Sequence, residues 1–182
     1  CETYESDVVP HLSSLPYQFI HNDANDQNVL VHRARPDDLT SSELVVAGLI
    51  DFGDMTYSKA LFEPAVAIAY VMLGKADPLT AAGQVIKGYH AQHRLTELDL
   101  KLLYPCAVMR LCMSVCISAF QQVAEPDNAY LSVSEENAWG LIEKLITFSP
   151  PVAEYRFRQA CGLPACPQTP EIESYLSSKH GS

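Results

Sequence analysis

The chain has 182 residues, of which 48% are hydrophobic and 19% charged, so it is long and apolar enough for one sizeable domain or two small ones. Its formal net charge of −10 argues against a surface for nucleic acid or an anionic membrane, because both need basic patches. The acidity is compatible with a small cationic substrate, and equally with a surface that only keeps the protein soluble.

The start of the chain and its cysteines indicate the cellular compartment in which the protein is expected. The first residue is Cys1 instead of Met, and no charged segment followed by an apolar one marks the chain for secretion, so we expect an excised piece of a longer cytoplasmic protein. The six cysteines form no C-x-x-C pair and no zinc pattern with histidine, and we expect them to be reduced. Cys112 and Cys116 lie four apart in an apolar run, which is typical of buried helix thiols. For Cys161 and Cys166, a disulfide is the alternative.

The first elements are short. Residues 1–15 carry apolar side chains at roughly helical spacing, but Pro10 lies among them, so we expect a short or broken helix that stops at Pro16. A strand over Tyr17–Ile20 should follow and lead into a polar loop.

The loop and the segments after it predict a β-hairpin. The sequence is FIHNDANDQNVLV, then RARPDDLTSS, then VVAGLIDFGD. We expect one strand over Asn28–Val31, an exposed connection over Arg33–Ser42, and a returning strand over Val45–Ile50. Such a hairpin brings Asp51 back to the start of the first strand.

The polar residues at the open end of this hairpin have the spacing H-x-D-x-x-x-x-N followed by D-F-G, which is typical of kinase-like phosphotransferases. Phosphoryl transfer needs a carboxylate for the acceptor hydroxyl proton and oxygen ligands for Mg²⁺ on the nucleotide phosphates. We therefore assign Asp23 as the catalytic base, and Asn28 and Asp51 as the ligands of Mg²⁺ and through it of the nucleotide. His21 completes the catalytic loop, where we expect its ring to brace the backbone instead of titrating. The alternative is a capped turn and an ordinary strand end.

Three carboxylates near these motifs are candidate contacts for a substrate ammonium group. They are Asp26, Asp54 and Glu63, and each of them has a turn or capping role as an alternative. Asp54 could also reach Mg²⁺ through water. Between the two aspartates of the D-F-G-D segment, Gly53 should permit a backbone turn that most residues resist.

Helices are predicted for most of the remaining chain. After a loop over Met55–Lys59, Glu63 and Pro64 should open a buried, wholly apolar helix that is too short to span a bilayer, which needs about 20 apolar residues. Asp77 caps the next helix, which runs to about Arg94. Its last turn holds His90 and His93, where favourable charge at a helix C-terminus and a metal pair are the two interpretations.

The longest helix should span Glu97 to about Ala124, opened by a capping box over Thr96–Asp99. Pro105 should kink or divide it. Arg110 is a lone charge in the apolar run CAVMRLCMSVCISAF, so we expect a carboxylate partner that ties this helix to a loop on the active-site side; contact with substrate is the alternative.

The last third should contain a loop over residues 125–132, a helix capped by Ser134, and a final helix over Val152–Cys161 that ends at Gly162. The tail from residue 163 should pack loosely or stay mobile. We thus expect a phosphotransferase lobe over residues 1–162 and a C-terminal tail over residues 163–182. With about three short strands and five helices, the fold class is α+β, mainly helical, with a small β-hairpin at the active site.

The runs NDQNVLV, LIDFGDM and EPAVAIAY, within residues 17–73, resemble the aminoglycoside phosphotransferase family, and within it hydroxylysine kinases and related domains. The resemblance implies the C-terminal lobe of a protein-kinase-like fold and an O-phosphotransferase that uses Mg²⁺ and ATP or GTP. It implies a small hydroxylated amine as substrate, such as hydroxylysine, an aminoglycoside or an amino alcohol. Asp23 then matches the catalytic aspartate, and Asn28 and Asp51 match the magnesium ligands. Asn25 stands where serine/threonine protein kinases carry Lys, and the loss of that charge suits a cationic acceptor.

Two departures from the family pattern matter. Asn22 stands where small-molecule kinases have Gly, although Asn accepts left-handed backbone angles. No phosphate-covering loop and no strand lysine precede residue 17, so we expect the nucleotide-clamping N-terminal lobe, and further domains of the parent protein, to lie outside this chain and the chain alone to have little activity. The competing hypothesis is a non-catalytic pseudokinase or interaction domain; a hydrolase is excluded for want of a recognisable nucleophile.

Overall fold

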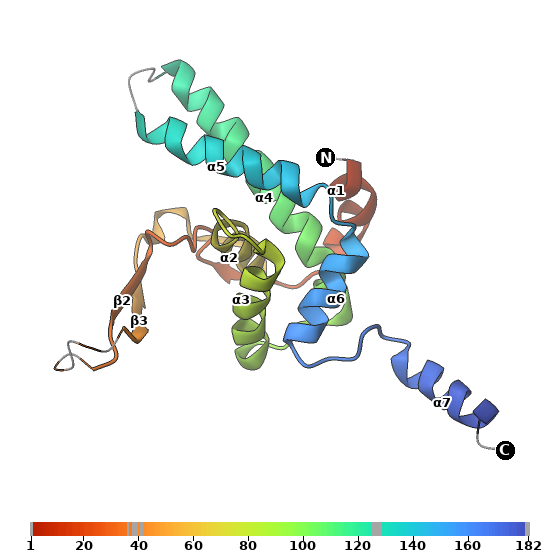
Figure 1. Ribbon diagram of the computed structural model, residues 1–182. Coiled ribbons are helices and arrows are strands. Elements are labelled where there is room, and N and C mark those ends of the chain that lie inside the picture. Colours follow the sequence, from red (N-terminus) through yellow and green to blue (C-terminus); the bar gives the residue numbers. More distant parts are fainter. Residues whose placement is uncertain (1, 36, 38–39, 41, 125–128, 181–182) are drawn as a thin grey trace.

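The computed structural model describes residues 2–35, 37, 40, 42–124 and 129–180, and within that part the β2–β3 hairpin extends from one side of a bundle of helices (Figure 1). The fold class is α+β and mainly helical, as the sequence predicts. The elements in chain order are α1 (Glu2–Asp7), the 3₁₀ turn η1 (Val9–Ser14), β1 (Tyr17–Ile20), β2 (Val29–Arg33), β3 (Leu44–Leu49), the 3₁₀ turn η2 (Phe52–Asp54), β4 (Thr56–Lys59), α2 (Phe62–Val71), α3 (Pro78–Gln92), α4 (Glu97–Ala124), α5 (Ala129–Leu145), α6 (Pro150–Ala160) and α7 (Thr169–His180).

The N-terminal helical segment is broken, as expected. It changes from α-helix to 3₁₀ turn around Val8, whose side chain is fully buried in the core. Pro10 stands in the first turn of η1, where its missing N–H has no helical partner to lose. The segment therefore ends as a cap on the helical bundle directly before β1.

The strands form two nested antiparallel pairs. β2 pairs with β3, with Val29 opposite Leu49, and β1 pairs with β4, with Tyr17 opposite Lys59. The prediction of a loop over residues 55–59 is therefore wrong for Thr56–Lys59, a polar segment without apolar alternation. Its strand conformation depends on β1, about forty positions earlier in the chain. The polar loop connects β1 of the outer pair to β2 of the inner pair, so both of its ends are anchored in paired strands.

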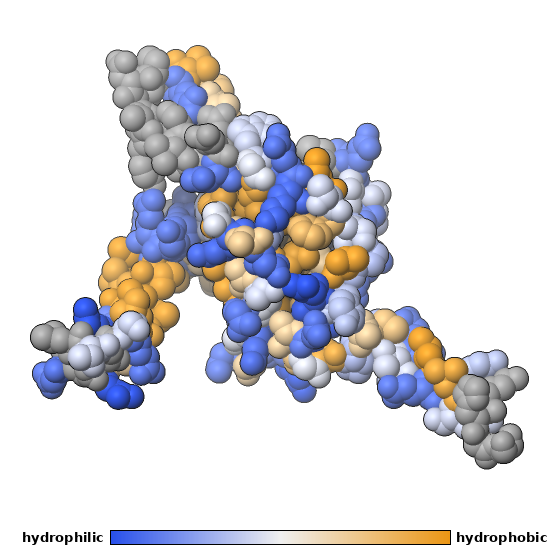
Figure 2. Space-filling model, viewed as in Figure 1, coloured by the Kyte–Doolittle hydropathy of each residue, from blue (hydrophilic) through white to orange (hydrophobic). Residues whose placement is uncertain are grey.

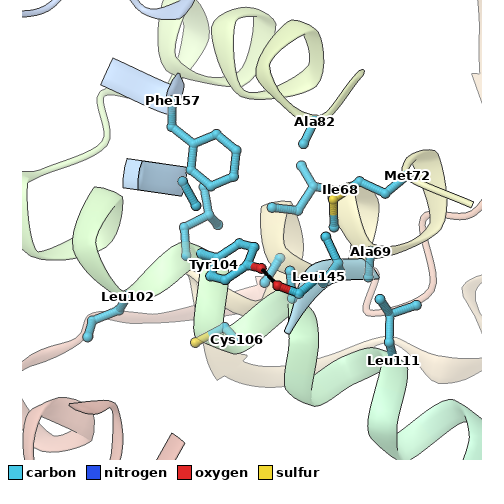
Figure 3. Close-up of a cluster of buried hydrophobic side chains, with 14 of the residues drawn as sticks. Ile68, Ala69, Met72, Ala82, Leu102, Tyr104, Cys106, Leu111, Leu145 and Phe157 are labelled. Atoms are coloured by element: carbon cyan, nitrogen blue, oxygen red, sulfur yellow. Dashed lines mark hydrogen bonds between the residues drawn. The ribbon is translucent and has the colours of Figure 1, made fainter. Parts of the chain in front are cut away.

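The core lies between α2, α3, α4, α5 and α6. In Figure 3, Ile68 and Ala69 of α2, Met72 directly after it and Ala82 of α3 point into the same interior as side chains from the other three helices. The buried Tyr104 hydroxyl donates to the Leu145 carbonyl at 2.6 Å, so a polar group in this core is satisfied. The apolar faces that the helical periodicity indicates are thus the faces that pack.

α4 is the central element of the bundle. It packs against α1, α2, α5 and α6 and is a single helix of 28 residues, so of the two predicted effects of Pro105, a kink or a division, the division does not occur. Packing on both sides outweighs the loss of one backbone hydrogen bond. The predicted capping box is present, with Thr96 N–H donating to Asp99 Oδ2 at 2.8 Å and Asp99 N–H donating to Thr96 Oγ1 at 3.1 Å. Contrary to expectation, Cys116 is exposed, because its side of α4 has no described neighbour.

By length and composition alone, Glu97–Val123 could cross a membrane, with a mean hydropathy of 1.7. Of its most apolar window, 44% is buried inside the protein, and the core helix of a soluble protein meets the same criterion. Packing against four other helices explains this apolar composition without a membrane.

The C-terminal third differs from expectation at two places. α5 begins at Ala129, five positions before the predicted cap at Ser134; the start of the predicted loop, residues 125–128, lies outside the described residues. α6 ends as predicted, with Gly162 at φ +70°, but the tail is not structureless, since α7 spans Thr169–His180. α7 projects away from the bundle and exposes its apolar side chains, which agrees with the expected loose packing (Figure 1). The free cysteines of the described part include Cys161 and Cys166, so no disulfide joins them.

Candidate active site

The side chain of Asp23 is held from three directions. Its Oδ2 accepts hydrogen bonds from the amides of Asn25 at 2.9 Å and Asn28 at 3.0 Å, and its Oδ1 lies 3.3 Å from Nη2 of Arg110. The side chain is 20% exposed, so the carboxylate is neither buried in the interior nor free in solvent. A fixed and accessible carboxylate is what a catalytic base requires.

The side-chain nitrogen of Asn28 is hydrogen-bonded, whereas its side-chain oxygen is available. It is buried, and its Nδ2 donates to both the backbone carbonyl of Asp23 at 2.9 Å and the carboxylate. In the part of the chain that the structure describes, its Oδ1 accepts no hydrogen bond. This oxygen is therefore available to a ligand, and oxygen is the donor atom that Mg²⁺ prefers.

His21 joins the polar loop to the D-F-G segment. Its Nε2 donates to the Ile50 carbonyl at 2.9 Å, its Nδ1 accepts from the Asp23 N–H at 3.3 Å, and its ring meets Phe52 edge-on at 4.9 Å between centroids. Both ring nitrogens are occupied by backbone groups, so one neutral tautomer satisfies both. Two contacts to backbone groups are what a residue that braces the loop would make.

Asp51 lies next to Asn28, as the predicted hairpin requires. The N–H of Ile50 donates to the carbonyl of Asn28 at 2.9 Å, which fixes the two segments side by side. Asp51 is exposed and has φ 60°, so the left-handed residue of this turn is Asp51 and the expectation for Gly53 is wrong. A Cβ at Gly53 would lie 3.3 Å from Asp51 Oδ1, a close contact that a small shift of this exposed side chain would relieve.

Glu63 holds the backbone of the catalytic loop. From the first turn of α2, its Oε2 accepts from the N–H of His21 at 2.5 Å and of Asn22 at 3.2 Å. Asn22 has φ 66°, as its tolerance of left-handed angles allows. Glu63 thus braces a loop about forty positions earlier in the chain, which neither the substrate alternative nor the capping alternative describes, and its Oε2 is already engaged.

The other candidate substrate residues differ in how far they are engaged. Asn25 closes the loop, since its Oδ1 accepts from the N–H of Gln27 at 2.8 Å and of Asn28 at 3.2 Å. Asp26 is exposed next to it. Asp54 stands in the first turn of η2, where its carbonyl accepts weakly from the Asn22 amide at 3.5 Å, while its carboxylate makes no hydrogen bond within the described part of the chain.

A cavity of about 710 Å³ opens beside Asp23. One wall is the catalytic loop, and the others come from the end of α2 with the turn after it, from α4 and from α5. Its lining residues include Asp23, Asn25, Asp26, Tyr70, Lys75, Ser114, Ser118, Gln121 and Asn137. The volume and the polar lining suit a small hydrophilic molecule. Sequence reasoning missed Tyr70 and Ser114, which had no motif to mark them.

The donor set fits a magnesium site of the kinase type. The described residues contain no group of three or more His, Cys, Asp and Glu that could hold a metal alone. The pair Asn28 and Asp51 offers two oxygen-bearing side chains at one edge. Mg²⁺ commonly binds through one or two protein oxygens together with substrate phosphates and water, so two suffice.

Comparison with known proteins agrees with this geometry. The model of the phosphotransferase enzyme family matches residues 4–98, just over half of the chain, and the chain belongs to this family. It is 29% identical to a hydroxylysine kinase of Xenopus laevis over 143 residues, and 29% identical to one of Danio rerio over 160 residues. These alignments cover 78% and 87% of the chain but 38% and 44% of the relatives, so the chain spans about two fifths of their length. No solved structure matches.

Proposed function

We propose that the protein containing this chain transfers a phosphoryl group from ATP or GTP to the hydroxyl of a small cationic compound. The observation that carries the proposal is the placement of Asp23, whose carboxylate is fixed by three side chains at the wall of a cavity of about 710 Å³. The catalytic loop supplies the base, and the cavity supplies space for the acceptor.

The residues divide the chemistry between them. Asp23 would accept or orient the proton of the acceptor hydroxyl as the oxygen attacks the terminal phosphorus. Asn28 and Asp51 would hold Mg²⁺, which when bound neutralises charge on the nucleotide phosphates. His21 and Glu63 hold the backbone that carries Asp23, so the base does not have to be ordered at each turnover.

Asp26 is the carboxylate of the cavity lining that a cationic acceptor would meet. Asp23 also lines the cavity, but it is paired with Arg110, and Lys75 lines the cavity too, so the case for a cationic acceptor comes from the relatives. Since the curated relatives are hydroxylysine kinases, hydroxylysine is the first acceptor to test, followed by amino alcohols and aminoglycosides.

The nucleotide should lie against the β2–β3 hairpin. Its apolar side chains are exposed, and Figure 2 shows this hydrophobic surface on the arm of the molecule. Ile50 and Phe52, which flank the proposed metal ligand Asp51 in the sequence, are exposed too. We expect the nucleotide-clamping lobe of the full-length protein to cover it, and the chain alone to have little activity.

The test is phosphorylation of hydroxylysine by the full-length protein with ATP or GTP and Mg²⁺. Asp23→Asn should lower kcat at least 100-fold, within the range for loss of general base catalysis, whereas Asp7→Asn on α1, outside the cavity lining, should not change it. Equal activity of the Asp23→Asn protein and the wild type would contradict the proposal. Binding of acceptor and nucleotide without turnover in the wild type would favour a pseudokinase.

A further inference from the structure

One cation lies against the proposed catalytic base, and it comes from a distant part of the chain. Nη2 of Arg110, in the middle of α4, lies 3.3 Å from Oδ1 of Asp23, 87 positions earlier. The two side chains are 19% and 20% exposed, so the pair is largely removed from water. The catalytic loop itself has the neutral Asn25 two residues after Asp23, and the positive charge at the carboxylate is thus supplied by α4.

The cavity wall holds Arg110 in place. The same Nη2 donates to the Tyr70 hydroxyl at 3.0 Å, and the guanidinium carbon lies 5.5 Å from the centre of the Tyr70 ring. The Tyr70 hydroxyl is in turn 3.4 Å from Ser114 Oγ. Tyr70 and Ser114 both line the cavity, so a continuous polar network joins the acceptor site to the base.

Arg110 is not satisfied as a purely structural arginine would be. Its Nε is buried and has no hydrogen-bond partner in the described part of the chain, an arrangement that costs free energy. Arg158 gives the contrast within the same protein. It is buried too, yet its Nε donates to the Pro164 carbonyl at 2.7 Å and its Nη1 pairs with Glu97.

The geometry points to Arg110 as a positioning residue for Asp23, an assignment that rests on the proposed phosphotransferase function. Asn25 and Asn28 hold Oδ2, and Arg110 holds Oδ1. With both oxygens held, the carboxylate cannot rotate away from the acceptor hydroxyl, and its charge is compensated in a site with little water. Loss of Arg110 should therefore affect the chemical step more than the binding of nucleotide.

The first experiment separates kcat from KM in the full-length protein. Arg110→Met keeps the aliphatic packing of the side chain and should lower kcat about 10- to 100-fold, the effect of a misplaced reacting group, with the KM for nucleotide unchanged. Arg110→Lys should recover part of the loss, because it restores the charge. In Arg110→Ala, added ethylguanidinium should recover activity by replacing the missing atoms. Arg156→Met, which removes an exposed arginine paired with Asp77, is the matched control and should behave as the wild type.

Unchanged kcat in Arg110→Met, or a kcat that neither lysine nor ethylguanidinium improves, would overturn the assignment. Such a negative result for Arg110 would leave the proposed function standing, provided that the wild type phosphorylates the acceptor and the Asp23→Asn protein does not. Absence of phosphotransfer in the wild type would instead refute the proposed function.

A second measurement needs no turnover. In a double-mutant cycle on Tm, Arg110→Met should lower Tm when Asp23 is present and much less when Asp23 is replaced by Asn. Equal losses in the two backgrounds would show that the two side chains do not interact and would overturn the assignment, whether or not the protein is active.

Discussion

Glu63 offers the sharpest test of how the catalytic loop is held. Its Oε2 accepts two backbone N–H groups, from His21 and from Asn22. Replacement by Ala removes the acceptor and leaves both donors without a partner. Replacement by Gln keeps an oxygen in the same place but removes its charge.

The magnitudes follow from burial. His21 is buried, so its N–H stays unsatisfied in Glu63→Ala, at a cost of about 1–3 kcal/mol, whereas Asn22 is half-buried and water can reach its N–H. Glu63 also stands in the first turn of α2, where a negative charge contributes about 0.3–1 kcal/mol. We therefore expect Glu63→Ala to lower the free energy of unfolding by about 2–3 kcal/mol. Glu63→Gln should lower it by about 1 kcal/mol, because a charge-assisted hydrogen bond is about twice as strong as a neutral one.

Urea unfolding of the 182-residue chain, followed by circular dichroism, measures both changes. The control is Glu143→Ala, which removes an exposed carboxylate from α5. If Glu63→Ala were no more destabilising than this control, the contact between α2 and the loop would not contribute to stability and the reasoning would fail. If Glu63→Gln lowered the free energy of unfolding as much as Glu63→Ala, the oxygen without its charge would contribute nothing. The separate estimates for the acceptor oxygen and for its charge would then be refuted.

Three further predictions concern single residues. Asn22 has φ 66°, so Asn22→Ala should cost about 1 kcal/mol in urea unfolding, while Asn22→Gly should be nearly neutral; equal losses would contradict the role of backbone angle. Burial raises the pKa of Cys106 from 9.0 to about 12. The thiol is neutral in both states below pH 9 and ionises first in the unfolded chain above it, so stability should fall between pH 9 and 12, by about 1.4 kcal/mol at pH 10 from this group. Urea unfolding at pH 8 and pH 10 measures the loss, and Cys106→Ala should reduce it, leaving the smaller contribution of Tyr104, whose pKa burial also raises to about 12. Among the thiols, Cys116 is exposed and should react with an aromatic disulfide reagent in the native protein, whereas Cys106 should react only on unfolding; mass spectrometry of the labelled peptides would reveal the reverse order.

The sequence alone determined the features that depend on neighbours a few residues away. The capping box of Thr96 and Asp99 and the cap at Asp77 are contacts over three positions, and both are present. The hairpin that brings Asp51 beside Asn28 follows from two apolar runs and the polar connection between them. The spacing of these motifs therefore predicted which segments lie side by side at the candidate site.

For Arg110, the sequence determines the kind of partner but not which residue it is. The cost of a lone charge in an apolar helix predicted a carboxylate partner on the active-site side, and that partner exists. Which carboxylate it is cannot be read from the chain, because several acidic residues near the loop meet the same requirement. Only the packing of α4 against α2 decided that the partner is Asp23 itself.

The tertiary structure also decided the pairing of β4 with β1 and the use of Glu63. Both join segments about forty positions apart, and neither has a local signal: Thr56–Lys59 lacks the alternation of a strand, and a glutamate in a first helical turn is adequately explained by the helix dipole. Hydrogen bonds between distant segments form only where the packed helices place donor and acceptor together. Local sequence therefore set the chemistry of the catalytic loop, whereas the helices packed behind it set its geometry.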